Sequence, residues 1–559
     1  MITIPEILID SYQDVPDQIA IHLLYQDKPP RAVSYHQLFL GSVGFAQALK
    51  EANIQPGEVV ILILDHGEDL VYAFFGSILH GAIPSIMPFL TEKLSPEKYR
   101  QSLQALIEIT SPGAIVTDQD FINDVELAIN VSSSIKSVLI ASNITLSNDV
   151  VPDHYHGSRS SPENIALLQH SSGTTGLQKG VALSHRAIIN QLDNYSSAIK
   201  LRADDVIVSW LPLYHDMGLI AGFVLPVLSR VPLVLLSPFD WVRAPHKLLR
   251  AISEYKGTLS WLPNFAYNFC AQKIRERDLA DIDLSSWRAV INCSEPIHWS
   301  SHKMFLERFS AYGFRKDALA SSYAMAENVF AVTQGGIDSA LTIDIIDGDA
   351  LRSEQIATPS KKNPKAVKMI SSGRCLTNTQ LRILDDQGEP LPERKIGEVA
   401  IKSDCMLTGY YNRPDLTQKA FNDGWYLTGD LGYLVNDELF ITGRKKDLII
   451  VGGKNIYPQD VERLAGEVDG VHPGRVVAFG IFNQRTGTED VVVIAESNPK
   501  SVEDRYNIAD EIRSVVTKNS DIALRNVNVV ERGWLLKTSS GKIARLANKY
   551  KYMEEMQNV

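Results

Sequence analysis

Short apolar runs alternate with amphipathic stretches over much of the chain. Residues 59–64, 114–117, 137–141 and 231–236 have the length and the aliphatic composition of buried strands. Between such runs lie segments like residues 36–53, where apolar residues recur every three or four positions, as in a helix packed on one face. The alternation predicts an α/β fold with mostly parallel sheets.

Two segments depart from this pattern. Residues 348–368 are polar, contain prolines and carry a basic cluster, which predicts a surface excursion or mobile insertion; we place the whole insertion at about residues 338–368. Residues 440–453 are two apolar strands joined by a charged turn, which indicates a domain boundary. We therefore divide the 559 residues into a large domain, 1–445, and a small one, 446–559.

Charge and cysteine usage narrow the class of protein. The net charge of -11 disfavours nucleic acid or an anionic membrane as a general partner. The four cysteines are far apart and lack metal-ligand spacing, so reduced thiols and a cytoplasmic location are expected. The N-terminus does not have the pattern of a signal peptide. Arg230 and prolines interrupt the most apolar stretch, residues 219–239, which favours a buried helix followed by a buried strand over a membrane span.

The segment 171–179, SSGTTGLQK, is rich in glycine and hydroxyl side chains and ends in Lys179. Its glycines let backbone amides approach an anion, and its hydroxyls are donors, so it predicts a phosphate-binding loop between two strands. The loop is not a P-loop, because Lys179 is followed by Gly180 and a strand-like run, and it has no G-x-G-x-x-G pattern. A merely polar hairpin turn is the alternative.

Three other stretches add candidate chemistry. In residues 321–330, Glu327 could hold Mg²⁺ that bridges phosphates, and Tyr323 could offer a flat face to a base. In residues 423–432, Asp430 is an acceptor suited to paired ribose hydroxyls. In residues 535–545, Lys542 follows a small flexible turn. Taken singly, each has an ordinary alternative: a packed ring with a solvated acid, a hairpin, and a solvated lysine.

In this order, the four stretches closely resemble those of the adenylate-forming superfamily of acyl-CoA synthetases, luciferases and nonribosomal adenylation domains, over essentially the whole chain. The resemblance implies a multi-subdomain N-terminal domain and a mobile α+β C-terminal lid. It also implies the reaction class, in which ATP activates a carboxylate to an acyl-adenylate and a thiol then takes the acyl group.

The resemblance also implies roles for individual residues. The catalytic residues would be Lys542, Glu327 and Thr174, with Glu327 as the Mg²⁺ ligand and Lys446 as the hinge. Residues expected to bind ATP or AMP are Ser171, Ser172, Gly173, Thr174, Thr175, Gly176, Lys179, Ser294, Glu295, Pro296, Ser322, Tyr323, Ala324, Met325, Asp430 and Arg444. Residues expected to bind the acyl group are His215, Asp216, Trp261, Leu262, Asn264 and Met325.

Within the superfamily, residues 211–229, 237–270, 292–296 and 371–376 look like fatty acyl-AMP ligases, and the polar insertion falls where that subfamily has one. This implies loading of a fatty acid onto the phosphopantetheine of an acyl carrier protein on a separate chain, in lipid, polyketide or lipopeptide biosynthesis. The alternatives are a fatty acyl-CoA synthetase, a non-catalytic acyl-nucleotide-binding protein and, less favoured, an amino-acid adenylation domain.

Several positions depart from the family pattern. Ala324 replaces the usual glycine, and Asn328 replaces a threonine or small residue, although its amide could still bind a phosphate oxygen. Trp261 stands where small residues are common. If it faces the acyl tunnel, it predicts a shorter or medium-chain substrate; packing in a core layer is the alternative. His215 could gate that tunnel or could simply be packed at a helix start.

Overall fold

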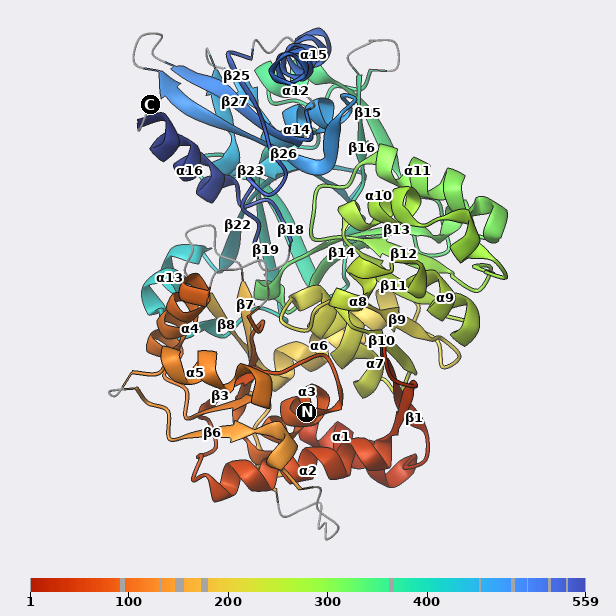
Figure 1. Ribbon diagram of the computed structural model, residues 1–559, viewed down its shortest axis with the longest axis vertical. Helices are drawn as coiled ribbons and strands as arrows, with labels where there is room; N and C mark the ends of the chain where they lie inside the picture. Colours follow the sequence, from red (N-terminus) through yellow and green to blue (C-terminus); the bar gives the residue numbers. More distant parts are fainter. Residues whose placement is uncertain are drawn as a thin grey trace.

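The computed structural model describes residues 2–90, 96–130, 133–145, 155–171, 179–360, 366–451, 454–483, 488–499, 501–520, 524–538 and 541–557. N-terminal elements gather at one end of the molecule and C-terminal elements at the other, and the middle of the chain joins them (Figure 1).

A 14-stranded mixed sheet runs through the large part of the molecule. From β1 to β13 its neighbours pair parallel by way of β10, β9, β11 and β12, as the alternating pattern predicts. From β13 onward its neighbours are antiparallel. In spatial order the strands are β18 (Thr379–Leu384), β19 (Gly397–Ser403), β22 (Trp425–Val435), β23 (Glu438–Arg444), β17 (Arg374–Cys375), β14 (Ala331–Gly335), β13 (Leu319–Ala324), β12 (Ala289–Asn292), β11 (Leu259–Leu262), β9 (Ile207–Ser209), β10 (Leu233–Leu236), β1 (Ile19–Leu24) and β2 (Arg31–Ser34), with β21 (Phe421–Asn422) on β22.

Two further sheets of the large part have four and three strands. The first is fully parallel, as expected, and consists of β4 (Ile83–Ile86), β3 (Val59–Ile63), β5 (Ala114–Thr117) and β6 (Ser137–Ile140). The second is antiparallel and consists of β20 (Gly409–Tyr410), β8 (Lys179–Ser184) and β7 (Ile165–Ser171). The two strands predicted to flank the glycine-rich loop are therefore β7 and β8.

Helices cover these sheets, and their boundaries follow from local chemistry. The α2 helix begins with a capping box between Ser34 and Gln37, α3 ends at Gly81 with φ of 87°, and the Ser184 hydroxyl accepts from the Ala187 amide at the start of α6. The helices are α1 (Ile4–Asp14), α2 (Tyr35–Glu51), α3 (Glu68–His80), α4 (Pro96–Thr110), α5 (Ile122–Ala128), α6 (His185–Ala198), α7 (Leu225–Leu228), α8 (Pro238–Arg243), α9 (His246–Tyr255), α10 (Asn264–Lys273), α11 (Trp299–Phe309) and α13 (Pro414–Ala420).

The polar segment predicted to be a surface excursion is partly buried. It starts with α12 (Gly348–Ser353) and ends in β16 (Ala366–Ile370), which pairs with β15 (Ile343–Asp347). Leu351 and Ala357 are buried in an apolar cluster with Tyr433, Phe440 and Tyr457. The expectation of a surface excursion is therefore wrong for these residues, because two apolar side chains anchor an otherwise polar segment.

The C-terminal part has its own core around a three-stranded sheet of β26 (Val471–Asn483), β27 (Thr488–Ser497) and β28 (Asn526–Val530). The hairpin of β24 (Ile449–Val451) and β25 (Lys454–Ile456) precedes it. Its helices are α14 (Pro458–Gly466), α15 (Val502–Ser520) and α16 (Arg545–Gln557). A helical turn, Lys445–Asp447, links it to β23, where the sequence predicts a boundary.

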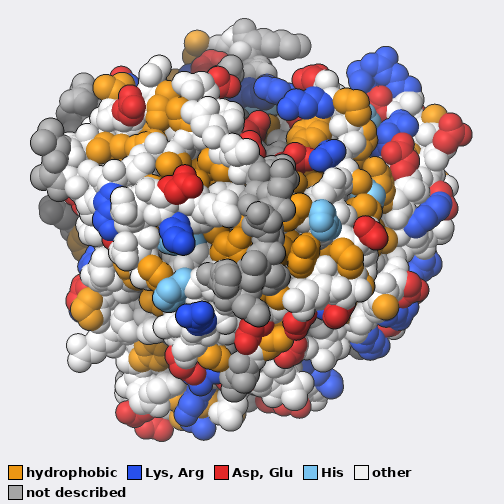
Figure 2. All heavy atoms as spheres, turned by 90° about the horizontal axis from the view of Figure 1, so that it is seen from below, with side chains coloured by type: hydrophobic (Ala, Val, Ile, Leu, Met, Phe, Trp, Pro, Cys, Tyr) orange, Lys and Arg blue, Asp and Glu red, His pale blue; other side chains and the backbone are white. Residues whose placement is uncertain are grey.

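No helix among the described residues is long and apolar enough to cross a membrane. The stretch 219–239 forms a buried π-helical segment, Met217–Val224, then α7 and β10, as predicted. All four cysteines are free thiols, and three of them are buried. On the face drawn in Figure 2, acidic and basic side chains are interspersed among apolar ones without a dominant sign.

Candidate active site

The glycine-rich loop connects two paired strand ends. Ser171 and Lys179 are register partners on β7 and β8. Ser172, Gly173, Thr174, Thr175 and Gly176 lie outside the described residues, as does the side chain of Ser171. The Lys179 ammonium lies 4.7 Å from the centre of the Tyr410 ring, in cation–π geometry.

Glu327 is held close to this lysine by the same tyrosine. The Tyr410 hydroxyl donates to Glu327 Oε1 at 2.9 Å and lies 3.0 Å from the Tyr426 hydroxyl. Burial, and then the charge of Glu327, raise the pKa of Tyr410, so its hydroxyl stays a donor at neutral pH. Tyr410 thus joins the candidate phosphate lysine to the candidate metal ligand, a link that a single sequence does not reveal.

The turn that carries Glu327 is strained. Val329 has φ of 61° and ψ of -55°, and the Phe330 amide donates to the Asn328 carbonyl across it, which makes a γ-turn of the rare kind. A β-branched residue there is unusual, and such strain persists only where the surroundings fix it. The Asn328 amide nitrogen donates to the Ala331 carbonyl, and its Oδ1 accepts from the Ser403 hydroxyl, so two of its hydrogen-bonding positions serve the fold.

Tyr323, Asp430 and Arg444 form a connected group at the end of a hairpin. The Tyr323 hydroxyl donates to Asp430 Oδ2 at 2.6 Å, and Arg444 Nε lies 2.9 Å from Asp430 Oδ1. Asp430 and Arg444 are register partners on β22 and β23. The charge of Asp430 raises the pKa of Arg444, so the guanidinium stays charged. Ala324 and Met325 continue from Tyr323 and are half-buried.

The loop after β12 is fixed by hydrogen bonds to α10. Glu295 Oε2 accepts from the Phe265 amide at 3.0 Å, in the first turn of that helix. Ser294 has φ of 67°, in the left-handed region, and Pro296 follows in the same loop. Asn264 ties the region together, because its Oδ1 accepts from the Asn292 amide group and from the His298 backbone.

Lys542 reaches the site from the C-terminal part. Burial acts to raise the pKa of Asp216, but the charges of His215 and then Lys542 outweigh it and hold that pKa below its usual range. His215 Nδ1 lies 2.6 Å from Asp216 Oδ1. Burial raises the pKa of the Cys293 thiol, and the charge of Lys542 opposes that rise. Cys293 Sγ lies 3.0 Å from Met217 Sδ. Lys542 is therefore within electrostatic reach of Asp216 and Cys293.

Of the predicted acyl residues, Asp216, Trp261, Leu262 and Asn264 are buried, whereas His215 and Met325 are half-buried. Trp261 is 1% exposed, Leu262 is fully buried and Asn264 is 7% exposed. Ser322, predicted near the nucleotide, is 2% exposed, and its hydroxyl donates to the Thr333 carbonyl.

Glu327 and the lysines fit a nucleotide with its metal. Mg²⁺ in phosphate-transfer sites is usually held by one or two carboxylates plus substrate phosphates. Glu327 offers one such carboxylate, which is half-buried and hydrogen-bonded to Tyr410. Among the described residues, no group of three or more His, Cys, Asp or Glu side chains forms an all-protein metal site.

Comparison with known proteins identifies the class. The AMP-binding enzyme family matches residues 10–411. The medium-chain-fatty-acid–[acyl-carrier-protein] ligase JamA of Moorena producens is 30% identical over 555 residues, covering 94% of this chain and 91% of JamA. The long-chain-fatty-acid–AMP ligase FadD32 of Mycolicibacterium smegmatis is 28% identical over 575 residues, covering 95% of this chain and 90% of FadD32.

Solved structures agree with this. One from a study of fatty acyl-adenylate ligases from E. coli and L. pneumophila has a TM-score of 0.91 at 27% identity and covers 100% of this chain and 98% of its own. A fatty acyl-adenylate ligase from L. pneumophila in complex with acyl adenylate and pyrophosphate has a TM-score of 0.76 at 26% identity, covering 99% of this chain and 96% of its own.

The fold and the family match are those of an adenylate-forming ligase. More particularly, the chain belongs to the AMP-binding enzyme family, and several of its relatives are fatty acyl-AMP ligases.

Proposed function

We propose that this protein is a fatty acyl-AMP ligase that uses ATP and Mg²⁺ to convert a fatty acid to acyl-AMP and passes the acyl group to the phosphopantetheine thiol of a separate acyl carrier protein. The observation that carries the proposal is the arrangement of Lys179, Glu327, Asp430 and Arg444, which come from separated segments, with Lys542 within electrostatic reach of Asp216. The relatives JamA, a medium-chain-fatty-acid ligase, and FadD32, a long-chain-fatty-acid–AMP ligase, support the acyl substrate.

In the first half-reaction, a carboxylate oxygen attacks the α-phosphorus of ATP and pyrophosphate leaves. Both reactants are anionic, so cations aimed at the transition state lower the barrier without a general base. Lys542 would neutralise charge between carboxylate and α-phosphate, and the Ser171–Lys179 loop would hold the outer phosphates. Mg²⁺, held by Glu327, would neutralise charge on the phosphates. Tyr323 would pack on adenine, and Asp430 and Arg444 would bind ribose.

In the second half-reaction, the thiol sulfur attacks the acyl carbonyl carbon and AMP leaves. One site can serve both steps if the C-terminal part, 446–559, is a lid that pivots at Lys446 and removes Lys542. Burial, and then the charge of Arg444, lower the pKa of Lys446. The proposed hinge residue therefore senses the charge of Arg444, one of the two proposed ribose contacts.

The test supplies ATP, Mg²⁺ and a panel of fatty acids, then either CoA or a phosphopantetheinylated carrier protein, with acyl-AMP and thioester followed by mass spectrometry. Acyl-AMP with acylation of the carrier alone is expected. Efficient acyl-CoA formation would instead make the protein an acyl-CoA synthetase. If wild type forms no acyl-AMP from any acid, the catalytic proposal fails and a nucleotide-binding role remains.

A matched pair of variants probes the role of Lys542. Lys542→Ala is expected to lower acyl-AMP formation at least a hundredfold, because a positioned charge in a water-poor site contributes ~3 kcal/mol or more. Lys537→Ala, five residues upstream in the same turn region, is the control and is expected to retain activity.

A further inference from the structure

Lys542 lies on the second of two short stretches, residues 536–538 and 541–544, that pair with each other; we call the two stretches the Lys542 segment. The Lys542 carbonyl accepts from the Thr538 amide at 2.8 Å, and the Lys542 amide donates to the Thr538 hydroxyl at 3.2 Å. The placement of this backbone matters, because a displacement of ~1 Å at a reacting centre can lower the rate about a hundredfold. Whatever holds the Lys542 segment therefore sets where the ammonium can act.

Asn548, in the first turn of α16, holds the Lys542 segment at its base. Its Oδ1 accepts from the Leu536 amide at 2.8 Å, and its Nδ2 donates to the carbonyls of Leu536 and Ala544, each at 2.9 Å. Asn548 is fully buried, so water does not compete for these hydrogen bonds. The Lys542 segment is thus fixed to α16 on both of its stretches.

Arg545, the first residue of α16, fixes that helix to three other elements. Its Nη2 donates to both carboxylate oxygens of Glu462 on α14, at 2.8 and 2.9 Å, and its Nε donates to the Ala478 carbonyl on β26 at 3.0 Å. Its Nη1 donates to Asp447 Oδ2 in the turn after β23. We call Arg545, Glu462 and Asp447 the Arg545 clamp.

The Arg545 clamp is partly enclosed and ionic. All three side chains are half-buried, and that of Arg545 is 20% exposed. Burial acts to lower the pKa of Arg545, but the charges of Glu462 and then Asp447 outweigh it, so the guanidinium stays charged. Charge-assisted hydrogen bonds of this kind are stronger than those of exposed ion pairs.

Asp447 connects the Arg545 clamp to the proposed hinge, because it directly follows Lys446 in the chain. The turn Lys445–Asp447 comes at the end of β23, next to Arg444 of the proposed ribose pair. Arg545 therefore ties the Lys542 segment to the point about which the lid would rotate. With this tie in place, rotation at Lys446 carries Lys542 together with α14 and β26.

We infer that Arg545 is a positioning residue for the adenylation step: its contacts with Asp447 and Glu462 hold the Lys542 segment to the hinge turn, so that Lys542 enters and leaves the site with the lid as one body. This inference rests on the proposed function. It assigns to Arg545 the placement of the Lys542 charge and no contact with the substrate.

The test measures kcat/KM for acyl-AMP formation by wild type, Arg545→Gln, Lys542→Ala and the variant with both substitutions. Arg545→Gln alone is expected to lower it about tenfold to a hundredfold, because the charge-assisted hydrogen bonds to Asp447 and Glu462 are lost. In the Lys542→Ala background, the same substitution is expected to change it less than about twofold, because no ammonium is left to position. A smaller folded fraction would instead lower both values by the same factor.

Two milder variants keep the test decisive if Arg545→Gln fails to fold. Asp447→Asn keeps the size of the side chain and removes its charge, so a loss of about threefold to tenfold is expected, again only where Lys542 is present. Arg545→Lys keeps the charge but not the planar fork that reaches Asp447 and Glu462 together, so its loss should be smaller than that of Arg545→Gln.

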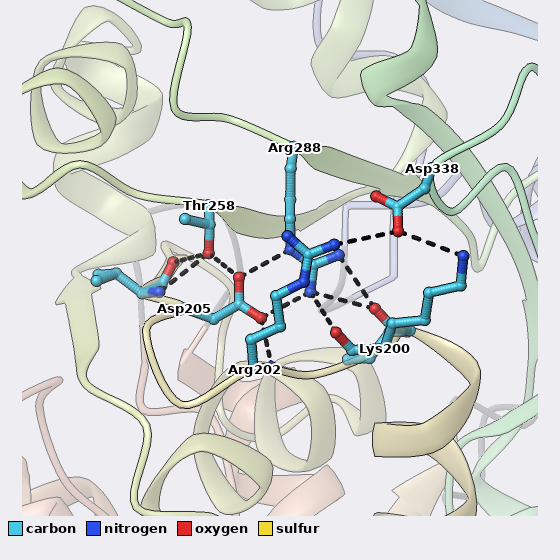
Figure 3. Close-up of polar contacts among 8 residues, drawn as sticks. Lys200, Arg202, Asp205, Thr258, Arg288 and Asp338 are labelled. Atoms are coloured by element: carbon cyan, nitrogen blue, oxygen red, sulfur yellow. Dashed lines mark hydrogen bonds and ion pairs between the residues drawn. The ribbon is translucent and has the colours of Figure 1, made fainter.

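Two arginines in exposed ion pairs are the controls. Arg505 on α15 lies 2.8 Å from Glu531, and its side chain is 44% exposed. Arg202, in the large part, lies 3.3 Å from Asp338 at the edge of the polar cluster that Figure 3 shows. Arg505→Gln and Arg202→Gln are expected to keep the wild-type kcat/KM, because exposed pairs contribute little.

Wild-type kcat/KM in both Arg545→Gln and Asp447→Asn would overturn the inference while leaving the proposed function standing. Equal losses with and without Lys542 would overturn it as well, because Arg545 would then stabilise the lid in general. Absence of acyl-AMP formation by wild type with every acid would instead refute the proposed function, so the two failures are distinguishable.

Discussion

Tyr410 is a single side chain that serves two charged groups of opposite sign. Its ring faces the Lys179 ammonium, and its hydroxyl donates to the Glu327 carboxylate. Each charge is thus held in position without a direct ion pair that would neutralise it. A lysine and a carboxylate kept apart in this way stay available for phosphate and metal, respectively.

Tyr410→Phe is expected to lower kcat/KM for ATP by tenfold to a hundredfold. A hydrogen bond to a charged group contributes ~1.5–3 kcal/mol, and its loss frees Glu327 to turn while the ring under Lys179 remains. ATP–pyrophosphate exchange measured over a range of Mg²⁺ concentrations would show the change.

Tyr411→Phe is the matched control for that variant. Its half-buried side chain is the next in sequence and packs near Gly180, and its loss of a hydroxyl should leave exchange unchanged. Equal losses in both variants would mean that the hydroxyl of Tyr410 does not position Glu327.

The residues predicted from sequence were those in short local patterns. Tyr323, Asp430 and Arg444 do come together, although Asp430 lies more than a hundred positions after Tyr323. Tyr410 has no local signal, because it acts through Lys179 and Glu327, which only tertiary folding brings near. The contacts of Asn328 with Ser403 and with the Ala331 carbonyl are likewise set by the folded turn and not by the sequence pattern.

At the scale of elements, α12 connects the insertion to the C-terminal part. Leu351 packs in one cluster with Tyr457, which directly precedes α14. Arg352 is 8% exposed and lies 2.8 Å from Asp349. Burial raises the pKa of Asp460 on α14, and the charges of Arg463 and Arg352 oppose that rise. The insertion therefore contributes both apolar and electrostatic contacts to α14.

Arg352→Glu is expected to loosen α14, because it replaces an attractive charge near Asp460 with a repulsive one. Amide hydrogen exchange over residues 458–466 should quicken about tenfold, which corresponds to ~1.4 kcal/mol. Arg513→Glu reverses a charge in an exposed pair on α15 and is the control. Unchanged exchange in α14 would show that Arg352 does not hold it.

The elements themselves were predictable to different degrees. Strands β3, β5, β6 and β10 and helix α2 match the apolar runs and the helical period to within a few residues. The segment around α12 was misjudged because its two apolar pairs, Ala350–Leu351 and Ile356–Ala357, are separated by four polar residues, and two short pairs give no clear period. Its partners, Tyr433 and Phe440, belong to strands far along the chain.

At the scale of the whole molecule, several buried histidines make stability depend on pH. Burial lowers the pKa of His170 and His185 to about 4 and that of His302 to about 3, against 6.5 for an ordinary histidine. Above about pH 6.5 both states are neutral. Below it, the unfolded chain takes up protons that the folded chain refuses, so the free energy of unfolding falls as pH falls.

Each such histidine should lower the free energy of unfolding by ~1.4 kcal/mol per pH unit between about pH 6 and about pH 4. Denaturant titrations across this interval would measure the slope. His185→Gln should reduce the dependence of the unfolding free energy on pH by ~1.4 kcal/mol per pH unit. His36→Gln, at an exposed position, should leave that dependence unchanged. A wild-type slope in His185→Gln would exclude His185 as one of the groups responsible.

The sequence pattern predicts only the parallel strands of the large sheet and not its antiparallel strands. Alternating strands and helices predict the parallel half, where each crossover helix returns the chain to the same edge. The antiparallel half, from β14 to β18, consists of hairpins whose partners are set by turns and by distant pairing, as between β17 and β23.

The hairpin of β22 and β23 has a consequence for how nucleotide and acceptor communicate. Asp430 and Arg444 face each other across it, and Lys445–Asp447 begins at its very end. Rotation of the backbone at Lys446 would therefore displace Arg444. A ribose bound to Asp430 would oppose that displacement. Such coupling is mutual: by whatever factor AMP biases the lid orientation, a carrier that favours one orientation must alter the affinity for AMP by the same factor. Binding of the carrier and release of AMP would then be governed by the same equilibrium between lid orientations.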